Sequence, residues 1–165
     1  MKNFSVSNVD DININKYLYF KNLQINRKYS SNKKKIKKLD HYLWWFQKQK
    51  FRKSFFILKD NIPIFISTAD HFQYKKYKLI YSGLISCLEE TNLFDILKAI
   101  KVQNDYLSKE KNKYCFISID RKNKVLMHHW KYFGYQPLNS KNKFYGFVKK
   151  FMKISNNHNT FYKKV

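Results

Sequence analysis

The sequence predicts an α/β (α+β) fold, a single domain in which a central, mixed and twisted sheet carries helices on both faces. Its length of 165 residues is enough for one compact core. Short helical patterns alternate along the chain with runs of β-forming residues. A long helical pattern also separates two apolar runs, which is typical of a right-handed crossover between parallel strands. We expect one domain over residues 1–154 and a loose tail over residues 155–165.

The first third of the chain contains one strand pattern and two helical patterns. Its expected elements are a strand at 3–6, a helix from Asp10 or Asp11 to Lys21, an irregular stretch at 22–32 and a helix from Lys37 to Phe51. Aspartate suits the start of a helix because its carboxylate accepts a free backbone N–H. In the second helix Leu39, Leu43 and Phe46 recur at intervals of four and three residues, so they form one apolar stripe.

The middle of the chain is typical of an antiparallel meander. Three apolar runs, at 54–58, 64–68 and 78–87, have the composition of strands, and the polar residues 59–61 form a turn between the first two. Pro63 lies at the entry to the second run, where a missing backbone donor does least harm. The three runs therefore predict neighbouring strands.

The last part of the chain returns to alternating helices and strands. Its expected elements are a helix at 93–107 capped by Thr91 or Asn92, a strand at 114–119, a helix at 124–133 that ends before Gly134, and a strand at 144–151. The run at 114–119 is continuously apolar, as expected of a strand buried on both faces. Because a helix separates them, the strands at 78–87 and 114–119 should be adjacent and parallel.

The chain is strongly basic, with a formal net charge of +23. Such a charge favours contact with phosphates, so a lysine-rich nucleic-acid-binding protein is one interpretation. However, 31 of the 34 basic residues are lysine, and arginine is the side chain that reads base edges best. The lysines are also spread along the whole chain, in a composition that A/T-rich codons favour. A solvated lysine surface with nonspecific affinity for nucleic acid explains this composition more simply.

Composition also excludes several classes of function. The three glycines, Gly83, Gly134 and Gly146, cannot form a glycine-rich phosphate loop. The two cysteines, Cys87 and Cys115, lack the further ligands of a zinc site, so we expect both to be buried and no metal to be bound. No apolar window is long enough to span a membrane and the N-terminal segment turns acidic, so we expect a cytoplasmic protein without a membrane partner.

Three sequence motifs occur in a fixed order. Residues 20–30 read FKNLQINRKYS and are similar to the pattern W-R-N-x-x-x-V-R-x-x-S. His41-Tyr-Leu-Trp-Trp-Phe46, followed by a strand and Asp60-Asn-Ile-Pro-Ile64, is similar to H-x-x-W-F, a strand and D-G-x-P-I-G. From Asn123 to Tyr135 the chain resembles N-x-x-A-x-x-L-Y-x-x-x-G-F, with the same spacing from asparagine to glycine. Together the motifs resemble the GNAT superfamily of N-acetyltransferases, nearest to the branch that acetylates ribosomal-protein termini and amino sugars.

The resemblance covers residues 14–150 and implies an activity as well as a GNAT-like fold. It implies an enzyme that moves an acetyl group from acetyl-CoA to a primary amine, on a nucleotide-linked amino sugar or at a protein N-terminus. Two alternatives remain open: a catalytically inactive protein of the same fold that serves as a binding module, and the lysine-rich nucleic-acid-binding protein. Binding of CoA would separate the first interpretation from the other two.

The resemblance also implies which residues meet acetyl-CoA. The strand backbone at Leu84, Ile85 and Ser86 would bind the pantetheine arm, and Asn123 would meet its far end. Members of the superfamily hold the pyrophosphate on backbone N–H groups of a glycine-containing loop that opens the next helix.

In this chain the pyrophosphate loop departs from the superfamily pattern. Residues 86–94 contain no glycine and no basic residue, and Glu89 and Glu90 would bring negative charge to the pyrophosphate. We therefore expect weak binding of acetyl-CoA or none. Replacing the two glutamates by glutamine and glycine should strengthen it, because charge is removed and the backbone can approach the phosphates.

Two sets of residues are candidates for proton transfer. Asp70 and His71 follow one another at the expected end of a strand, and a carboxylate can orient an imidazole base that deprotonates an amine. The superfamily's usual general acid, a tyrosine, falls on Trp130, whose indole N–H does not titrate. His128 or His129 could take that role, but successive helix residues point about 100° apart, so at most one can face a cleft. We take His128 as the catalytic candidate.

Three residues are candidates for binding the acceptor substrate. Arg27 lies at the arginine position of the first motif and could pair with a phosphate or a carboxylate. Trp45 belongs to the aromatic run at 44–46, of which one ring at most can stack on a sugar while the others pack into the core. Asp120 follows the strand at 114–119, at the expected mouth of the cleft.

Overall fold

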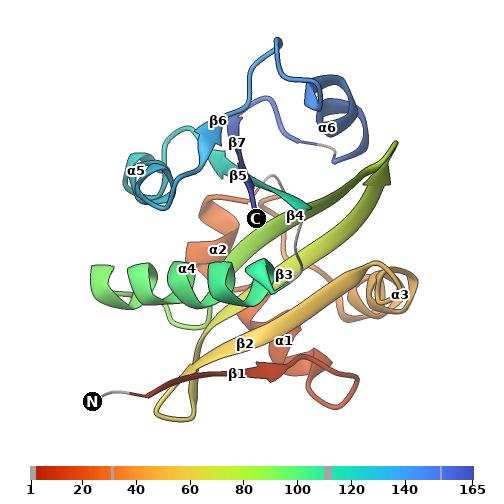
Figure 1. The fold of residues 1–165 in the computed structure, drawn as a ribbon. Helices are drawn as coiled ribbons and strands as arrows, with labels where there is room; N and C mark the ends of the chain where they lie inside the picture. The colour runs from red at the N-terminus through yellow and green to blue at the C-terminus, as the bar shows by residue number, and fades with distance from the viewer. Residues whose placement is uncertain (1–2, 31, 110–112, 153) are drawn as a thin grey trace.

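The computed structural model describes residues 3–30, 32–109, 113–152 and 154–165, which form a seven-stranded sheet flanked by helices (Figure 1). The elements in chain order are β1 (Phe4–Asn8), α1 (Ile14–Lys21), α2 (Gln24–Lys28), α3 (Lys38–Lys48), β2 (Arg52–Lys59), β3 (Ile62–Tyr74), β4 (Tyr77–Ser86), α4 (Leu93–Ser108), β5 (Lys113–Asp120), α5 (Lys124–Tyr132), β6 (Gln136–Pro137), α6 (Tyr145–Phe151) and β7 (His158–Lys164). The strands lie in the order β1-β2-β3-β4-β5-β7-β6. Every neighbouring pair is antiparallel except β4 and β5, which confirms the predicted mixed sheet.

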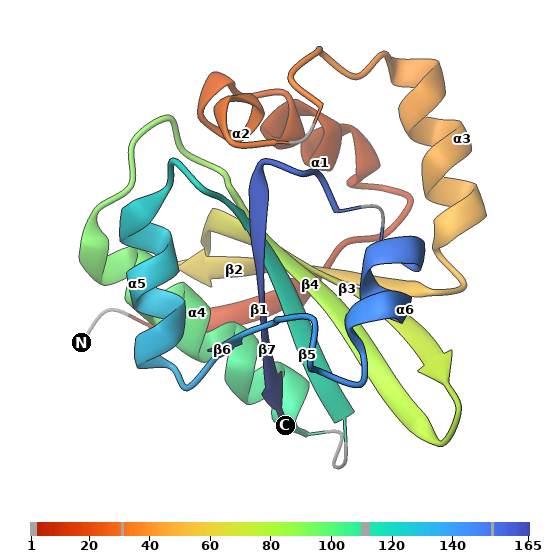
Figure 2. The ribbon, with the colours of Figure 1, turned by 90° about the horizontal axis from the view of Figure 1, so that it is seen from above.

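Helices cover both faces of the sheet (Figure 2). Successive strand residues point to opposite faces, so each strand contributes to two apolar layers. On one face α1 and α3 pack against Phe56 and Ile66, and α6 packs against Phe116. On the other face α4 and α5 pack against Ile80 and Cys115. The domain therefore has the three layers that the sequence predicts.

The crossover from β4 through α4 to β5 creates the opening in which the candidate site lies. β4 pairs with β5 only from Lys78 to Ser82, opposite residues 113–117. β4 then continues beside β3 as far as Ser86. Beyond Ser82 the two parallel strands separate. The predicted adjacency and parallel direction of these two strands are confirmed.

The C-terminal part of the chain differs from the prediction in two ways. The segment predicted as a strand at 144–151 is the helix α6, because Phe144, Val148 and Met152 recur every four residues and bury one helical face. The predicted loose tail at 155–165 contains β7, which pairs with β5 from residue 114 to residue 120 and buries Phe161. The tail is therefore part of the sheet, and the expected domain boundary at residue 154 is wrong.

The N-terminal elements also differ in detail from the prediction. The stretch expected to be irregular, at 22–32, contains the short helix α2. α1 begins at Ile14 rather than at Asp10, whose carboxylate accepts the N–H groups of Ile12 and Asn13 in the preceding turn. Aspartate also favours such turns, because the same oxygen that caps a helix can accept the N–H groups of a turn.

α3 packs on the sheet through a different side from the stripe that the sequence indicates. His41 and Trp45 are its buried residues, whereas Leu39, Leu43 and Phe46 are exposed. Both sets have helical spacing, so the periodicity alone does not say which one faces the core.

Both cysteines are buried, as predicted. Burial raises the pKa of the Cys87 thiol to about 12 and that of the Cys115 thiol to about 11, so both stay protonated at neutral pH. Within the described ranges, no three histidine, cysteine or acidic side chains gather closely enough to hold a metal ion. No helix in the same ranges is both long and apolar enough to cross a membrane.

Candidate functional site

The gap between β4 and β5 opens into a cleft of about 500 Å³. Its walls come from the α1–α2 region, the start of β2, the ends of β4 and β5, the start of α5 and the segment between α6 and β7. Six of the predicted site residues line it, namely Arg27, Leu84, Ile85, Ser86, Asp120 and Asn123. The other four, Trp45, Asp70, His71 and His128, are not part of its walls.

The end of β4 presents one unoccupied backbone edge to the cleft. Next to an antiparallel neighbour, the N–H and C=O of one strand residue point toward that neighbour, and those of the following residue point away. The N–H of Cys87 points toward β3, where it donates to the backbone oxygen of Ile64 at 2.9 Å. The backbone groups of Leu84 and Ser86 therefore point away from β3, toward the cleft. Those of Leu84 meet no hydrogen-bond partner in the part of the chain that the structure describes.

At Ser86 the same backbone edge is already occupied by the side chain of Asn26. The Asn26 Oδ1 accepts the N–H of Ser86 at 2.9 Å, and its Nδ2 donates to the oxygen of Ser86 at 2.8 Å. Nδ2 also donates to the oxygen of Phe20 at 2.7 Å. The carboxamide thus makes the two bonds that a neighbouring strand would make. Ser86 lines the cleft, but its backbone is not free to bind a pantetheine arm as expected.

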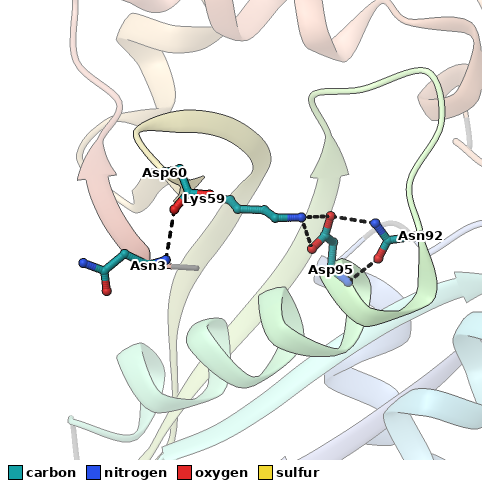
Figure 3. A network of polar contacts seen from close by, with 5 residues as sticks. All are labelled: Asn3, Lys59, Asp60, Asn92 and Asp95. Carbon is teal, nitrogen blue, oxygen red and sulfur yellow. Dashed lines mark hydrogen bonds and ion pairs between the residues drawn. The ribbon is translucent and has the colours of Figure 1, made fainter. Parts of the chain in front are cut away.

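The start of α4, where the pyrophosphate was expected, carries a network of hydrogen-bonded and ion-paired side chains (Figure 3). The Asn92 Oδ1 accepts the N–H of Asp95 at 2.9 Å, and its Nδ2 donates to the Asp95 carboxylate at 2.9 Å. The Lys59 ammonium lies 2.8 Å from both oxygens of the buried Asp95 carboxylate. The N-terminal end of this helix is therefore capped and neutralised by the chain itself.

Glu89 and Glu90 do not face the cleft. Both side chains are exposed, and neither belongs to the cleft wall. The expectation that they bring negative charge to a bound pyrophosphate is therefore wrong. The bend between β4 and α4 turns them toward solvent, a direction that residue types alone do not reveal.

α5 places a histidine in the cleft, and it is His129 rather than His128. His129 lines the cleft, and its buried Nε2 has no hydrogen-bond partner among the described residues. His128 is exposed and borders a separate groove, so its choice as the catalytic residue is wrong. Trp130 is buried in the core on the next helical position. Asn123 lines the cleft, and its Oδ1 caps α5 by accepting the N–H of Leu126 at 3.1 Å.

The end of β5 adds polar groups to the mouth of the cleft. Asp120 is buried in the cleft wall, and its Oδ1 accepts the N–H of Lys122 at 2.8 Å. Tyr81 on β4 and Ser118 on β5 also line the cleft, and their side chains interact with one another. Burial raises the pKa of Tyr81, so its hydroxyl stays protonated at neutral pH. The cleft therefore has a carboxylate and two hydroxyl groups at one mouth.

Asp70 and His71 do not form the predicted pair. They lie inside β3 rather than at its end, and adjacent strand residues point to opposite faces of the sheet. Asp70 instead forms a bidentate ion pair with Arg52, whose guanidinium lies 4.6 Å from the ring centre of Trp44. Burial alone would lower the pKa of Arg52, but the hydrogen bonds to Asp70 raise it above its ordinary value. Asp70 therefore holds Arg52 in the cleft wall. His71 lies on the opposite face of the sheet, where burial lowers its pKa.

Two of the candidates for the acceptor site are used by the fold. Arg27 lines the cleft, and its Nε and Nη1 donate to the oxygens of Asn22 at 3.1 Å and Lys33 at 3.3 Å. Arg27 therefore braces the segment that follows α2. Trp45 is buried, and its indole N–H donates to the Asp11 carboxylate at 2.7 Å. Its choice as a stacking surface for substrate is wrong, because the ring belongs to the core.

The structure adds Asn26, Arg52 and Tyr81 to the site. Asn26 stands at the valine position of the first sequence motif, and a polar residue at an apolar position is a signal of a specific contact. Arg52 is one of three arginines among many lysines, which is a weaker signal of the same kind. Tyr81 lies in an aromatic-rich strand and has no distinguishing signal in the sequence.

The cleft residues match the two parts of acyl-CoA, the pantetheine arm and the pyrophosphate, to different degrees. The unoccupied edge at Leu84 suits the amide groups of a pantetheine arm, since strand edges bind extended chains through such bonds. The start of α4 lacks a glycine cradle, and the Asn92 side chain already takes one of its N–H groups. The residues therefore fit the arm well and the pyrophosphate less well.

No protein-family profile matches the chain, and no curated protein sequence matches it either. Solved structures are similar to it along its whole length. They include a GNAT-family acetyltransferase from Streptococcus pneumoniae, with a TM-score of 0.68, 6% identity and 98% of each chain covered. A ribosomal-protein-alanine N-acetyltransferase from Brucella melitensis has a TM-score of 0.69 and 6% identity, over 98% of this chain and 99% of that one. YncA from Salmonella typhimurium, whose structure holds its cofactor acetyl-CoA, has a TM-score of 0.65 and 6% identity, over 98% of this chain and 93% of that one. The protein therefore has the GNAT fold.

Proposed function

We propose that this protein is an N-acetyltransferase that moves an acetyl group from acetyl-CoA to the primary amine of an acceptor. The observation that carries the proposal is the presence of the unoccupied Leu84 backbone edge and the unpaired His129 imidazole in one cleft. A strand edge can bind an extended amide chain, and an imidazole can transfer a proton near neutral pH. Both groups lie where β4 and β5 separate, on a fold that acetyltransferases share.

Acetyl-CoA would supply an activated thioester, and the residues of the cleft would bind, orient and transfer protons. Leu84 would hold the arm by donating its N–H and accepting at its oxygen. His129 would give a proton from Nε2 to the leaving thiolate, because imidazole is a general acid of suitable strength. Asp120 would attract the acceptor ammonium and take up a proton from it, while Tyr81 and Ser118 orient the acceptor through their hydroxyl groups.

The charge of the cleft favours an anionic acceptor. Its wall contains four basic side chains, Lys21, Lys34, Arg27 and Arg52, and one acidic side chain, Asp120. Arg27 and Arg52 have partners within the fold, whereas lysine ammonium groups adapt readily to a phosphate. Of the two acceptors that the sequence motifs imply, a nucleotide-linked amino sugar therefore fits this cleft better than a protein N-terminus.

A thiol-release assay tests the proposal. Acetyl-CoA is mixed with the protein and either a nucleotide-linked amino sugar or a peptide with a free N-terminus. We expect amine-dependent release of CoA thiol, faster with the nucleotide-linked sugar. His129→Gln should lower kcat about 100-fold, and His128→Gln should leave it unchanged.

Three results would contradict the proposal. Absence of thiol release together with absence of CoA binding would favour an inactive binding module. Equal effects of His129→Gln and His128→Gln would remove His129 from the chemistry. Strongly salt-dependent binding of single-stranded RNA, with no response to CoA, would favour the nucleic-acid-binding alternative.

A further inference from the structure

α3 is apolar on two opposite sides, and only one of them is covered. His41 and Trp45 face the core. Leu39, Leu43 and Phe46 are 68%, 55% and 56% exposed, and we call these three residues the α3 outer face. Their spacing of four and three residues places them in one stripe along the helix. Single exposed apolar residues are ordinary, but a continuous stripe marks a surface that meets a partner.

Exposed lysines are concentrated in α3 and in the segments directly before and after it. The exposed lysines next to or within α3 are Lys33, Lys34, Lys35, Lys37, Lys38, Lys48 and Lys50. Between residues 32 and 53 the sequence contains a single acidic residue, Asp40. A second copy of this chain would bring the same cations against one another, whereas an anionic partner would neutralise them.

The type of cation indicates what kind of anionic partner fits. Arginine binds a fixed carboxylate or phosphate through two parallel hydrogen bonds, whereas lysine is a flexible point charge. The segment around α3 contains seven exposed lysines, and its nearest arginine, Arg52, is bound to Asp70. Flexible point charges around a short apolar stripe suit a fluid surface of phosphate headgroups better than a structured protein surface.

Other elements on the same side of the molecule also carry exposed lysines. The turn between β3 and β4 and the helix α6 lie on the side of α3 in both ribbon views (Figures 1 and 2). The turn carries the exposed residues Lys75 and Lys76. α6 carries Lys149 and Lys150, which are exposed, next to Phe151, which is 53% exposed. Lysines and an exposed aromatic ring thus recur beyond α3.

We propose that the α3 outer face docks on an anionic lipid surface. Leu39, Leu43 and Phe46 would enter the boundary between headgroups and acyl chains, and the surrounding lysines would contact the phosphates. This is attachment to a surface and needs no membrane-spanning helix. It revises the expectation from the sequence that no membrane partner exists, because that expectation considered only spanning segments. The proposal does not depend on the acetyltransferase activity.

Co-sedimentation with lipid vesicles tests the proposal. Vesicles of phosphatidylcholine alone are compared with vesicles that also contain phosphatidylglycerol. The protein should sediment with the mixed vesicles and stay in solution with the neutral ones. Raising the salt concentration should weaken the binding, because screening acts on exposed charges.

Two variants separate the apolar and the charged contributions. Leu39→Gln/Leu43→Gln/Phe46→Gln should lower vesicle binding at least tenfold, and glutamine keeps the helix because its propensity is high. Lys35→Gln/Lys50→Gln should lower it about fivefold for each lysine removed. Circular dichroism should show that both variants remain folded, since every replaced side chain is exposed.

A matched variant on another helix controls for the loss of exposed apolar area. Leu88→Gln/Leu93→Gln/Phe94→Gln also removes two leucines and one phenylalanine, at residues that are 36%, 51% and 56% exposed. Leu88 lies in the loop before α4, and Leu93 and Phe94 lie in its first turn; the start of α4 is on the opposite side of the molecule from α3 (Figures 1 and 2). This control variant should bind mixed vesicles as the wild type does.

Several results would overturn the proposal. Equal binding to both kinds of vesicle, or equal losses in the α3 and control variants, would show that the α3 outer face does not direct attachment. Absence of binding to mixed vesicles would also reject it. Concentration-dependent self-association in analytical ultracentrifugation, abolished by the α3 variant, would assign this face to a second copy instead.

Discussion

The two walls of the cleft use their polar groups in different ways. In the wall formed by the α1–α2 region and β2, Asn26 makes three hydrogen bonds, Arg27 holds two backbone oxygens and Arg52 holds Asp70; we call it the bonded wall. In the wall formed by β4 and α5, the backbone of Leu84 and the Nε2 of His129 have no partner in the described chain; we call it the open wall. Buried polar groups are nearly always paired, so unpaired groups that also line a cleft are candidates for contact with a ligand.

This comparison explains why residue type alone is a poor guide to the site. Asp70, Arg27 and Trp45 have the side chains of catalysis and recognition, but each is occupied by a partner within the fold. A side chain that already forms a hydrogen bond or an ion pair with another residue stabilises the fold and is not free to bind a ligand. We expect changes in the bonded wall to affect folding and changes in the open wall to affect ligand binding and turnover.

The largest expected effect is in the bonded wall, at the ion pair of Arg52 and Asp70. Arg52→Ala should destabilise the fold by about 3 to 5 kcal/mol, because it leaves the largely buried Asp70 carboxylate without its partner. Lys101→Ala is a matched control, because it breaks an exposed pair with Asp105 and should cost less than about 1 kcal/mol. Urea denaturation measures both. Equal small losses would mean that Arg52 does not anchor the wall.

The next largest effect is in the open wall, at His129. If its imidazole supplies a proton during turnover, the pH profile of kcat should have a limb that His129→Gln removes. The free energy of unfolding should change by less than about 1 kcal/mol, because Nε2 has no partner to lose among the described residues. A variant that retains the limb would show that His129 does not transfer the proton, and one that fails to fold would show that His129 stabilises the structure.

Asn26 should show effects of opposite sign on stability and on affinity. Asn26→Ala should lower the free energy of unfolding by about 1 to 3 kcal/mol, because the backbone groups of Ser86 and Phe20 lose their partner. It should also strengthen acetyl-CoA binding about fivefold, because the edge at Ser86 becomes available to the arm. Calorimetry measures the affinity and thermal unfolding the stability.

A second asparagine provides the control for Asn26. Asn22 also makes two hydrogen bonds with backbone groups, both to Ile36, at 3.0 and 2.8 Å, and it does not line the cleft. Asn22→Ala should therefore lower stability by a similar amount and leave the affinity unchanged. If both variants change the affinity equally, the change comes from general destabilisation of the fold. It would then not come from competition between Asn26 and the pantetheine arm for the Ser86 backbone.

A pH effect on stability should arise behind the bonded wall, at His41. His41 is buried, and its ring lies 5.3 Å from that of Trp44, which in turn contacts Arg52. Burial lowers the pKa of His41 below its ordinary value of 6.5, so below that pH the unfolded chain binds the proton first. Stability should therefore fall with acidification, by up to about 1.4 kcal/mol per pH unit, and recover above pH 6.5.

Replacing His41 checks the origin of that slope. Glutamine does not titrate. In His41→Gln the unfolding free energy should therefore change less steeply with pH below 6.5, by up to the contribution of one proton. His71, whose pKa burial also lowers, contributes a slope of the same sign, and His71→Gln should reduce it independently. An unchanged slope in the His41 variant would mean that this ring is protonated in the fold.

The smallest effect is expected at Glu89 and Glu90. Glu89→Gln/Glu90→Gly should change acetyl-CoA affinity less than about twofold, because exposed charges outside the cleft are screened by salt. The sequence alone led to the opposite expectation. A tenfold gain in affinity on titration with acetyl-CoA would show that the glutamates do reach the bound pyrophosphate.

Much of the fold could be predicted because its signals are local. The apolar runs of the meander, the cap at Asn92 and the glycine after α5 each fix an element through nearby residues. Gly134 has a φ of +84°, a conformation that side chains other than glycine rarely adopt. Helix and strand patterns at 144–151 compete more evenly, and there the packing of Val148 against the sheet decides for the helix.

The candidate site was harder to predict because its contacts are distant in sequence. Asn26 meets Ser86 across 60 residues, and no pattern near either residue indicates the bond. In a strand, adjacent side chains such as Asp70 and His71 point to opposite faces of the sheet. In a helix, adjacent side chains such as His128 and His129 point about 100° apart. The sequence therefore indicates that two adjacent side chains point in different directions, but only the packed structure shows which of them faces the cleft.

The central claim is that acetyl-CoA binds along the open wall, at the edge of β4. Nuclear magnetic resonance of the ¹⁵N-labelled protein tests it directly, by following individual amides during titration with acetyl-CoA. We predict a saturable shift of the Leu84 amide and of the His129 ring, with a smaller change at Ser86, whose N–H remains bonded to Asn26. A spectrum that does not respond, or shifts confined to Ser86 and the Asn26 side chain while Leu84 is unchanged, would contradict the claim.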